Sequence, residues 1–328
     1  MNPRLNPALN PVLAPTSQPV EPLSPSLFLP YAYLQGQFLP FQQAQISIAT
    51  HALHYGTAVF GGIRGLPSPA DPQTLLLFRL AAHCRRLSQS AKYLGYAVAP
   101  EELQSRLLEF VRLNRPRVPF YLRPLIYTSG LGIAPRLHQV EKDLLIYGLP
   151  MGEFLSSSGV RCRFSSWYRQ EDRSLPLRGK ASAAYIASAL AKSEAVTSGF
   201  DEAILMNTQG KVSEASAMNL FLVRNGCLIT PGVDQDILEG ITRDSLLTLA
   251  RDVGMPVQER PVDKSELLIA DEVFLCGTAA QLTPVTQIET YMLPSHRPIT
   301  ALLSTQLKAA FEGRTDRYRD WITTVSLD

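Results

Sequence analysis

Apolar residues recur at two different periods along the first half of the chain. Positions 84, 87, 91 and 94 are apolar at helical spacing, and Gly95 follows them as a candidate C-cap. Elsewhere the apolar residues alternate with polar ones or form short continuous runs, which is the pattern of strands. Helices are therefore predicted over residues 81–94 and 100–113. Strands are predicted within 31–48, with a turn at 35–37, and at 75–78, 120–127 and 143–149.

The second half mixes the same two periods without a regular strand–helix–strand order. Asn225-Gly226 stands between two apolar runs and is a strong β-hairpin signal. Strands are predicted at 160–164, 203–206, 211–214, 219–223, 227–230 and 271–276. Helices are predicted at 182–198, closed by Gly199, and at 242–253, with a loop over 167–180. This irregular order favours an α+β fold over a doubly wound parallel sheet.

Length and proline content predict how the chain is divided. The 328 residues are enough for two domains. Residues 1–30 carry eight of the 25 prolines, few charges and no amphipathic period, so we expect a disordered or extended arm over 1–26. A stretch rich in serine and glycine follows Pro150 and is the best linker candidate. The expected division is a smaller α/β domain at 27–152, a linker at 153–158 and a larger domain at 159–328.

Composition argues against several classes of protein. The chain is 45% hydrophobic and 18% charged, as in a globular protein with a sizeable core. A net charge of +2 gives no sign of nucleic-acid or membrane binding. No secretory signal pattern and no apolar run of transmembrane length are seen. The four cysteines are widely spaced and resemble neither a disulfide framework nor a zinc site, so we expect a reducing cytoplasm.

Lys180 is the most informative residue of the sequence. It is one of seven lysines against twenty-four arginines, and it is flanked by small residues just before an apolar helical run. A lysine that attacks a carbonyl needs little hydration and small neighbours. Glu214 follows among equally small residues. A lysine and an acid for a pyridinium nitrogen are the pair that pyridoxal phosphate (PLP) chemistry needs. The alternative is a solvated helix-start lysine and a solvated turn glutamate.

Three further segments could bind an anion. Gly240-Ile241-Thr242 opens a helix whose free N–H groups and threonine hydroxyl suit a phosphate, although Thr242 could be a simple N-cap. The segment 276–280 joins a strand end, a glycine and Thr278, and could equally be an ordinary turn. Arg64 follows two glycines and suits bidentate phosphate binding.

Two pairs of residues stand out by their spacing. Tyr121 and Arg123 lie on one face of a predicted strand, where a phenol and a guanidinium could read a carboxylate; a plain surface strand is the alternative. His51 and His54 have a spacing of three, but no third metal ligand is suggested nearby. We therefore expect no metal, and interpret these histidines and Tyr55 as residues that order a loop.

Taken together, these segments resemble the branched-chain amino acid aminotransferases of the class IV family of fold-type IV PLP enzymes. The similar stretches occur in the family's order and cover nearly everything after about residue 30. They are THALHYGTAVFGGIR (50–64), FYLRPLIY (120–127), GKASAAYIAS (179–188), VSEASAMNLF (212–221), LEGITRD (238–244) and DEVFLCGTAAQLTPV (271–285). The resemblance implies the two-domain fold of that family, also called D-amino-acid aminotransferase-like.

The resemblance also implies roles for the residues that bind the cofactor, PLP. Lys180 is expected to be the Schiff-base lysine and the proton carrier. Glu214 is expected to bond the pyridine nitrogen, and Tyr185 the phenolic oxygen of the cofactor. The residues expected to hold the phosphate are Arg64, Ile241, Thr242 and Thr278.

For the substrate, the resemblance implies that the amides of Thr278 and Ala279 meet the α-carboxylate. Tyr121 and Arg123 are expected to line the side-chain pocket. In this family the active site lies between two domains and includes a loop from a second subunit, so a homodimer or higher homo-oligomer is expected.

The activity implied by the resemblance is transamination of leucine, isoleucine or valine with 2-oxoglutarate. A D-amino-acid transaminase on the same fold is the nearest alternative, but its histidine two residues after the strand arginine is missing, since Leu125 stands there. An aminodeoxychorismate lyase is the second alternative. Four positions depart from the family pattern and put the substrate range in doubt: Gly61, Phe154, Ala184 and Gln281.

Overall fold

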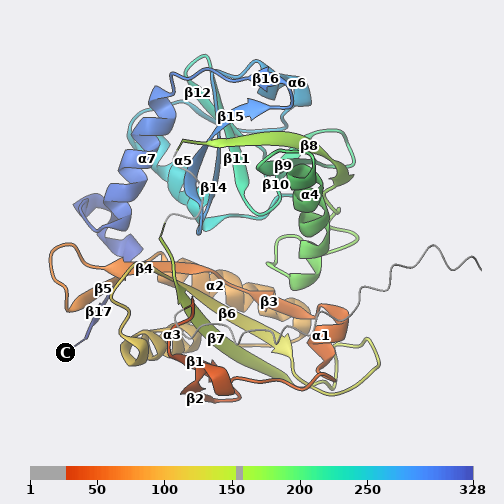
Figure 1. Ribbon diagram of the computed structural model, residues 1–328, viewed down its shortest axis with the longest axis vertical. Helices are drawn as coiled ribbons and strands as arrows, with labels where there is room; N and C mark the ends of the chain where they lie inside the picture. The colour runs from red at the N-terminus through yellow and green to blue at the C-terminus, as the bar shows by residue number, and fades with distance from the viewer. Residues whose placement is uncertain (1–26, 153–157, 328) are drawn as a thin grey trace, which may run out of the picture.

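The computed structural model describes residues 27–152 and 158–327. Within these ranges the strands form one sheet of eight strands and one of nine. Figure 1 shows the first sheet in the lower half of the molecule and the second in the upper half, with helices packed on both. The predicted α+β fold class is confirmed, because antiparallel and parallel strand pairs are mixed with helices in no regular order.

The first sheet is antiparallel throughout, in the order β17-β5-β4-β6-β7-β1-β2 with β3 paired to β6. Its long central pair, β6 and β7, runs in register over nine residues of each strand, so a side chain on one strand lies beside a defined side chain on the other. The strands are β1 (Tyr31–Leu34), β2 (Gln37–Pro40), β3 (Ala58–Phe60), β4 (Ile63–Pro67), β5 (Thr74–Phe78), β6 (Phe120–Thr128), β7 (Lys142–Pro150) and β17 (Ile322–Ser326).

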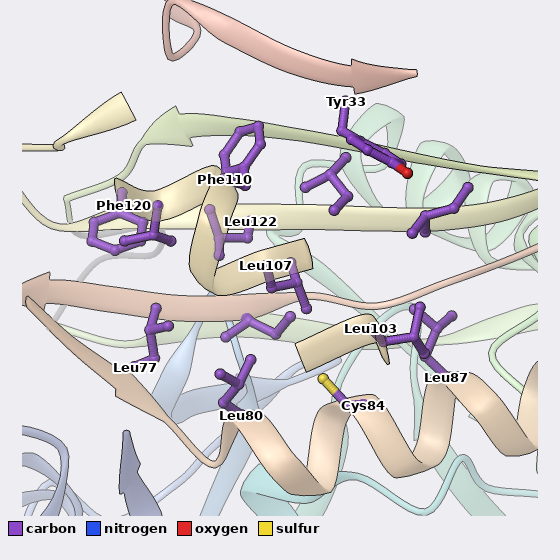
Figure 2. Packing of buried hydrophobic residues seen from close by; sticks show 14 of the residues in the cluster. Tyr33, Leu77, Leu80, Cys84, Leu87, Leu103, Leu107, Phe110, Phe120 and Leu122 are labelled. Carbon is purple, nitrogen blue, oxygen red and sulfur yellow. The ribbon is translucent and has the colours of Figure 1, made fainter. Parts of the chain in front are cut away.

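Helices α2 (Leu80–Ala91) and α3 (Pro100–Asn114) form one apolar core with this sheet. Figure 2 shows their leucines, Cys84 and Phe110 meeting side chains of β1, β5 and β6. On β6, Phe120 and Leu122 point into this core, whereas the intervening Tyr121 lies on the opposite face, because side chains alternate along a strand. The core thus fixes which residues of β6 face the second sheet.

The second sheet has the order β10-β9-β8-β15-β14-β11-β12-β13, with β16 paired to β15. Three of its strand pairs are parallel: β8 with β9, β8 with β15, and β12 with β13. The strands are β8 (Val160–Tyr168), β9 (Glu202–Met206), β10 (Val212–Ala215), β11 (Asn219–Arg224), β12 (Cys227–Thr230), β13 (Val257–Glu259), β14 (Glu272–Gly277), β15 (Gln281–Ile288) and β16 (Tyr291–Met292).

Helix α4 (Tyr185–Thr197) contacts β8 and β9, while α5 (Ile241–Asp252) and α7 (Pro298–Phe311) contact β14. Figure 1 accordingly shows α4 on one side of the second sheet and α5 with α7 on the other. The short helices are α1 (His51–Tyr55), α6 (Lys264–Leu268) and the 3-10 turns η3 (Phe41–Gln43), η4 (Lys92–Leu94), η5 (Ser182–Ala184) and η6 (Asp316–Trp321). No helix in the described ranges is long and apolar enough to span a membrane.

Most predicted elements are found within a few residues of their expected bounds, and two differences are informative. The strand pattern predicted up to residue 48 is wrong after Pro40, where the 3-10 turn η3 follows because proline has no N–H to continue the ladder. The helix α7 and the strands β15 and β17 were not predicted. Their apolar residues are covered from other parts of the chain, which short-range periodicity does not register.

The last strand, β17, returns to the first sheet. It pairs with β5 along its whole length, and Figure 1 shows the C-terminal end beside that strand. Residues 322–326 thus lie with the sheet of 27–152, although the sequence division assigned them to 159–328. The predicted arm at 1–26 and nearly all of the predicted linker lie outside the described residues, and the domain boundaries stay a prediction.

Candidate active site

A cavity of about 650 Å³ is lined by residues of both sheets and their loops. One side, here called the arginine wall, consists of Phe60, Tyr121, Arg123, Leu125, Tyr147 and Leu149. The other side, the lysine wall, consists of the lining residues within 179–185, 214–219, 238–242 and 276–280. Every site residue predicted from the sequence lines this cavity except Arg64.

Lys180 belongs to the lysine wall and is partly buried. Its Nζ donates a hydrogen bond of 2.6 Å to the Tyr185 hydroxyl and lies 5.0 Å from the centre of the Phe60 ring. The pKa of Lys180 is well below its ordinary value, chiefly because burial disfavours the charged amine and because Arg86 repels it. The structure therefore favours an uncharged, nucleophilic amine, and the alternative of a solvated helix-start lysine is wrong.

Glu214, on β10, is the one acid that lines the cavity within the described residues. Its Oε1 forms an ion pair with Arg169 Nη2 at 2.8 Å. Its Oε2 accepts hydrogen bonds from Asn219 Nδ2 at 2.8 Å and from the Leu238 N–H at 3.2 Å. Burial raises the pKa of Glu214, while Arg169 opposes this shift. The second half of the alternative, a solvated turn glutamate, is therefore also wrong.

Tyr185 completes this part of the lysine wall at the first position of α4. Burial, followed by the charge of Glu214, raises the pKa of the Tyr185 phenol to about 12. The phenol therefore keeps its proton at neutral pH and can donate it in a hydrogen bond while accepting one from Lys180.

The predicted anion-binding segments both reach the cavity. Helix α5 begins at Ile241, and the capping residue Gly240 has no side chain to satisfy the first N–H groups. A Cβ at Gly240 would lie 1.9 Å from Asn219 Oδ1, so only glycine fits this close approach. Thr278 lies in the hairpin turn between β14 and β15, directly after Gly277. The two segments bring backbone N–H groups and two threonine hydroxyls to one end of the cavity.

Arg64 lies beside this end but not on the cavity surface. Its Nη1 donates to the carbonyl of Ala279 at 2.8 Å, and its Nη2 donates to the carbonyl of Gly152 at 2.7 Å. With Thr242 and Thr278 it lines a separate hollow of about 60 Å³. Arg64 therefore supports the 278–280 turn and lies beside Thr242 and Thr278, and its expected contact with a phosphate stays a prediction.

Tyr121 and Arg123 share the cavity face of β6, as the period of two predicts. Arg123 Nη2 donates to the Tyr121 hydroxyl at 3.2 Å, and the guanidinium carbon lies 4.6 Å from the centre of the Phe60 ring. Arg123 Nε is buried and has no hydrogen-bond partner among the described residues. A Cβ at Gly62 would lie 1.9 Å from the Tyr121 oxygen, so this glycine makes room for the phenol. The plain surface-strand alternative is wrong, because Tyr121 is buried.

Comparison with known proteins identifies the family. The profile of the family described as Amino-transferase class IV matches residues 73–288. The chain belongs to the class IV aminotransferases. A protein called probable branched-chain-amino-acid aminotransferase, from Synechocystis sp., is 62% identical over 301 residues, which cover 92% of this chain and 99% of that protein. The resemblance drawn from the six sequence stretches is confirmed.

Solved structures of this family have the same fold. The branched-chain aminotransferase of Thermoproteus uzoniensis, solved with norvaline, is 36% identical, with a TM-score of 0.86 over 90% of this chain and 99% of that one. The branched-chain amino acid aminotransferase of Thermobaculum terrenum, solved in PLP-form, is 37% identical, with a TM-score of 0.86 over 91% of this chain and 99% of that one. The predicted fold-type IV architecture is thus confirmed for this class IV aminotransferase.

Sequence reasoning missed two arginines that line the cavity of this class IV aminotransferase, Arg86 and Arg169. Arg86 lies on α2 and donates to the Glu239 carbonyl at 3.1 Å, next to the start of α5. The spacing of His83, Arg86 and Ser90 puts three polar residues on one helix face, which was a signal in the sequence, and the structure buries His83 and Ser90. No local signal existed for Arg169, because its partner Glu214 is brought beside it by strand pairing.

The four departures from the family pattern lie in different surroundings. A Cβ at Gly61 would lie 3.0 Å from Pro124 Cγ, so a side chain there would face Pro124. Ala184 is buried and lines the cavity, where a larger side chain would reduce its volume. Gln281 has a positive φ of 56° and lines the smaller hollow beside Arg64. Phe154 lies outside the described residues.

The histidines of α1 order a loop, as predicted. His51 Nδ1 lies 2.9 Å from the hydroxyls of Thr57 and Thr128, and its Nε2 lies 3.0 Å from the Ala134 carbonyl. Tyr55 donates to the carbonyl of Ile133. These contacts tie α1 to the segment after β6. In the described part of the chain, no three His, Cys, Asp or Glu side chains are grouped so as to hold a metal ion.

Proposed function

We propose that this class IV aminotransferase is a PLP-dependent branched-chain-amino-acid transaminase. It transfers the amino group of leucine, isoleucine or valine to 2-oxoglutarate and so gives branched 2-oxo acids and L-glutamate. The observation that carries the proposal is the position of the weakly basic Lys180 amine, the Tyr185 phenol and the buried Glu214 carboxylate around one cavity. The names of the relatives described above point to the same activity.

The residues of the lysine wall fit PLP chemically. An amine, a phenol and a carboxylate suit its aldehyde, its phenolic oxygen and its ring nitrogen, respectively. The N-terminus of α5, Thr242 and Thr278 suit its phosphate, and we assign Arg86 rather than Arg64 as the arginine on that phosphate. When bound, PLP supplies an aldehyde that takes up the amino group and a ring that accepts electrons.

The chain's own residues then provide attachment, orientation and proton transfer. Lys180 Nζ, whose buried surroundings disfavour its charged form, can attach the cofactor and afterwards carry a proton between substrate and cofactor atoms. Tyr185 keeps its proton and holds an oxygen in place. Glu214 remains hydrogen-bonded by three groups of the chain, so it presents a fixed negative charge to a ring nitrogen.

The arginine wall suits the side chains of the two kinds of substrate. Its surface is mainly apolar or aromatic, and leucine, isoleucine or valine can pack there. We infer that the Arg123 guanidinium, whose Nε has no hydrogen-bond partner among the described residues, binds the γ-carboxylate of glutamate or 2-oxoglutarate. Thr278 and Ala279 line the same cavity, and their N–H groups suit the α-carboxylate.

The comparisons give no support to a D-amino-acid transaminase or an aminodeoxychorismate lyase. Leu125, which stands where the D-amino-acid enzymes are associated with a histidine, lines the cavity and makes this part of the wall apolar. Leu125 thus weighs against that alternative by its place in the cavity as well as by its residue type. No second function is proposed.

A homodimer is part of this proposal. Large apolar side chains are exposed on α4, on the end of β8 and around α1, where an isolated subunit would leave them in water. They are Trp167, Tyr168, Ile186, Val196, Leu53, Leu131 and Ile133. Light scattering on purified protein should give twice the chain mass of 36.2 kDa or a higher multiple. We also propose a cytoplasmic location, which the four free cysteines favour.

A panel of amino donors and oxo-acid acceptors, including both enantiomers of each donor, tests the proposed function. Leucine, isoleucine and valine in the L-form should react with 2-oxoglutarate far faster than the D-forms. Faster turnover of D-amino acids would contradict the proposal, as would release of pyruvate from aminodeoxychorismate.

A further inference from the structure

Arg169 is a buried cation of the cavity that the mechanism above does not use. It directly follows β8, and its side chain is 8% exposed, against 7% for its partner Glu214. Its backbone N–H donates to the Met206 carbonyl at 2.8 Å, and its Nε donates to the Asp236 carbonyl at 3.1 Å. The guanidinium is thus anchored independently of Glu214 and can act as a fixed partner for that acid.

Both carboxylate oxygens of Glu214 are bound by other groups of the chain. Arg169 binds Oε1, and Asn219 and Leu238 bind Oε2. Lys180 lines the same cavity but forms no ion pair with Glu214 or with any other described acid, and its amine donates to Tyr185 instead. A carboxylate and a protonated amine in one poorly solvated cavity would attract each other strongly, so pairing with Glu214 would favour the charged form of Lys180.

The charges that face Lys180 and Glu214 come from several elements. Around Lys180 they are Arg86 on α2, Arg123 on β6, Arg169 and Glu214. Around Glu214 they are Arg169, Lys180 and Arg243 on α5. The neighbouring titratable groups are His83, Tyr121 and Tyr185. Burial and Arg86 lower the pKa of Lys180 most, and only Glu214 among these groups raises it, so the partner that Glu214 takes bears on how strongly the charged lysine is favoured.

We propose that Arg169 is a positioning residue which, as the fixed partner of Glu214, keeps that carboxylate from pairing with Lys180 and leaves the lysine amine to Tyr185. Glu214 thereby stays available to a ring nitrogen and Lys180 stays available as a nucleophile. The inference rests on the proposed function for the use made of both groups, but the charge arrangement itself belongs to the chain without cofactor.

Removing Arg169 should therefore raise the pKa of Lys180. The Arg169→Gln change deletes a cation near the amine and also releases an anion toward it, and both effects favour the protonated lysine. Protonated lysine does not react with acylating agents, so the pH midpoint for acylation of Lys180 should move upward. Arg169→Lys keeps the charge and should leave the midpoint near that of the wild type.

The test is trace acetylation of the full-length protein, stripped of PLP, with acetic anhydride over a range of pH. Mass spectrometry of the peptide containing Lys180 gives the midpoint. The double variant Arg169→Gln/Glu214→Gln is the decisive control: without the released acid, its midpoint should fall back from that of Arg169→Gln toward lower pH. If Arg169→Gln only disordered the site, the pH midpoint for acylation of Lys180 would instead shift equally in Arg169→Gln and in the double variant.

A wild-type midpoint in Arg169→Gln, or no difference between that variant and the double variant, would overturn the proposal. If Arg169→Gln does not fold, the double variant should fold again, because the unpaired buried acid has been removed; failure of both to fold would also count against the role. Since PLP is absent throughout, these outcomes are independent of the proposed function, which PLP binding and the donor panel test separately.

Discussion

The two walls of the cavity differ in how their polar groups are partnered. On the lysine wall, Glu214 is bound by three groups and Lys180 by the Tyr185 phenol. On the arginine wall, Arg123 contacts one phenol and an aromatic ring, and its buried Nε has no described partner. A bound cofactor needs the same contacts in every turnover. Two unlike substrates instead need a hydrogen-bond donor, here Arg123, that binds the acidic substrate and makes no bond to the apolar one.

The difference also has an energetic side. A guanidinium that keeps one donor unsatisfied costs free energy in the absence of an acidic ligand, roughly 1–3 kcal/mol for a buried polar group. Stacking on Phe60 and Tyr121 offsets part of this cost without blocking the donors. The arginine wall can thus accept a leucine side chain and still bind a carboxylate.

The largest effect is expected at the centre of the lysine wall. Lys180→Ala should abolish turnover, because loss of proton transfer alone costs about 100- to 10,000-fold in rate, and the attachment point is lost as well. Lys92→Ala, at an exposed lysine on η4, is the matched control and should retain activity. Borohydride treatment with PLP should label Lys180 in the wild type; a label on another lysine would contradict the assignment.

The next effect tests whether Glu214 is needed for its charge. Glu214→Gln keeps the shape and one acceptor oxygen, so much of the PLP should remain bound. The rate should fall by roughly 100- to 1,000-fold, as for removal of one fixed charge that stabilises a transition state. Single-turnover absorbance measurements with leucine separate binding from chemistry. A variant as fast as the wild type would remove the ring-nitrogen role.

A smaller and more selective effect is expected on the arginine wall. Arg123→Gln should raise the KM for glutamate and 2-oxoglutarate about 10- to 100-fold, because a charge-assisted hydrogen bond worth roughly 1.5–3 kcal/mol is lost. Leucine, which packs on apolar surface, should be affected much less. Steady-state kinetics with each substrate decide this. If the KM values for leucine and glutamate rose equally, Arg123 would have only a structural role, and the proposed difference between the two walls would be wrong.

The smallest effect distinguishes Arg86 from Arg64. Arg86→Ala should weaken PLP binding about tenfold, since the N-terminus of α5 and the threonines still hold the phosphate. Arg64→Ala should weaken it less, because Arg64 acts through the carbonyl of Ala279. Titration of each PLP-free variant with PLP measures both constants. A larger loss of PLP affinity in Arg64→Ala than in Arg86→Ala would assign the phosphate to Arg64, as the sequence had suggested.

What the sequence by itself determined is local. Helix ends at Gly95 and Gly240, the hairpin at Asn225-Gly226, and the common face of Tyr121 and Arg123 depend on backbone preferences and on side chains a few residues apart. The chemistry of Lys180 and Glu214 could be inferred because the adjacent residues show both that their neighbours are small and that they lie at a helix start or a strand end. The family resemblance added predictions for nearly all the other residues of the site.

Only the tertiary structure decided which charged groups meet. Arg86 rather than Arg64 reaches the cavity because α2 packs beside the start of α5. Arg169 meets Glu214 because β8, β9 and β10 are neighbours in one sheet. Strand β17 joins the first sheet from the far end of the chain. Such contacts join residues tens to hundreds of positions apart, and their energies depend on burial and distance, which periodicity along the chain does not encode.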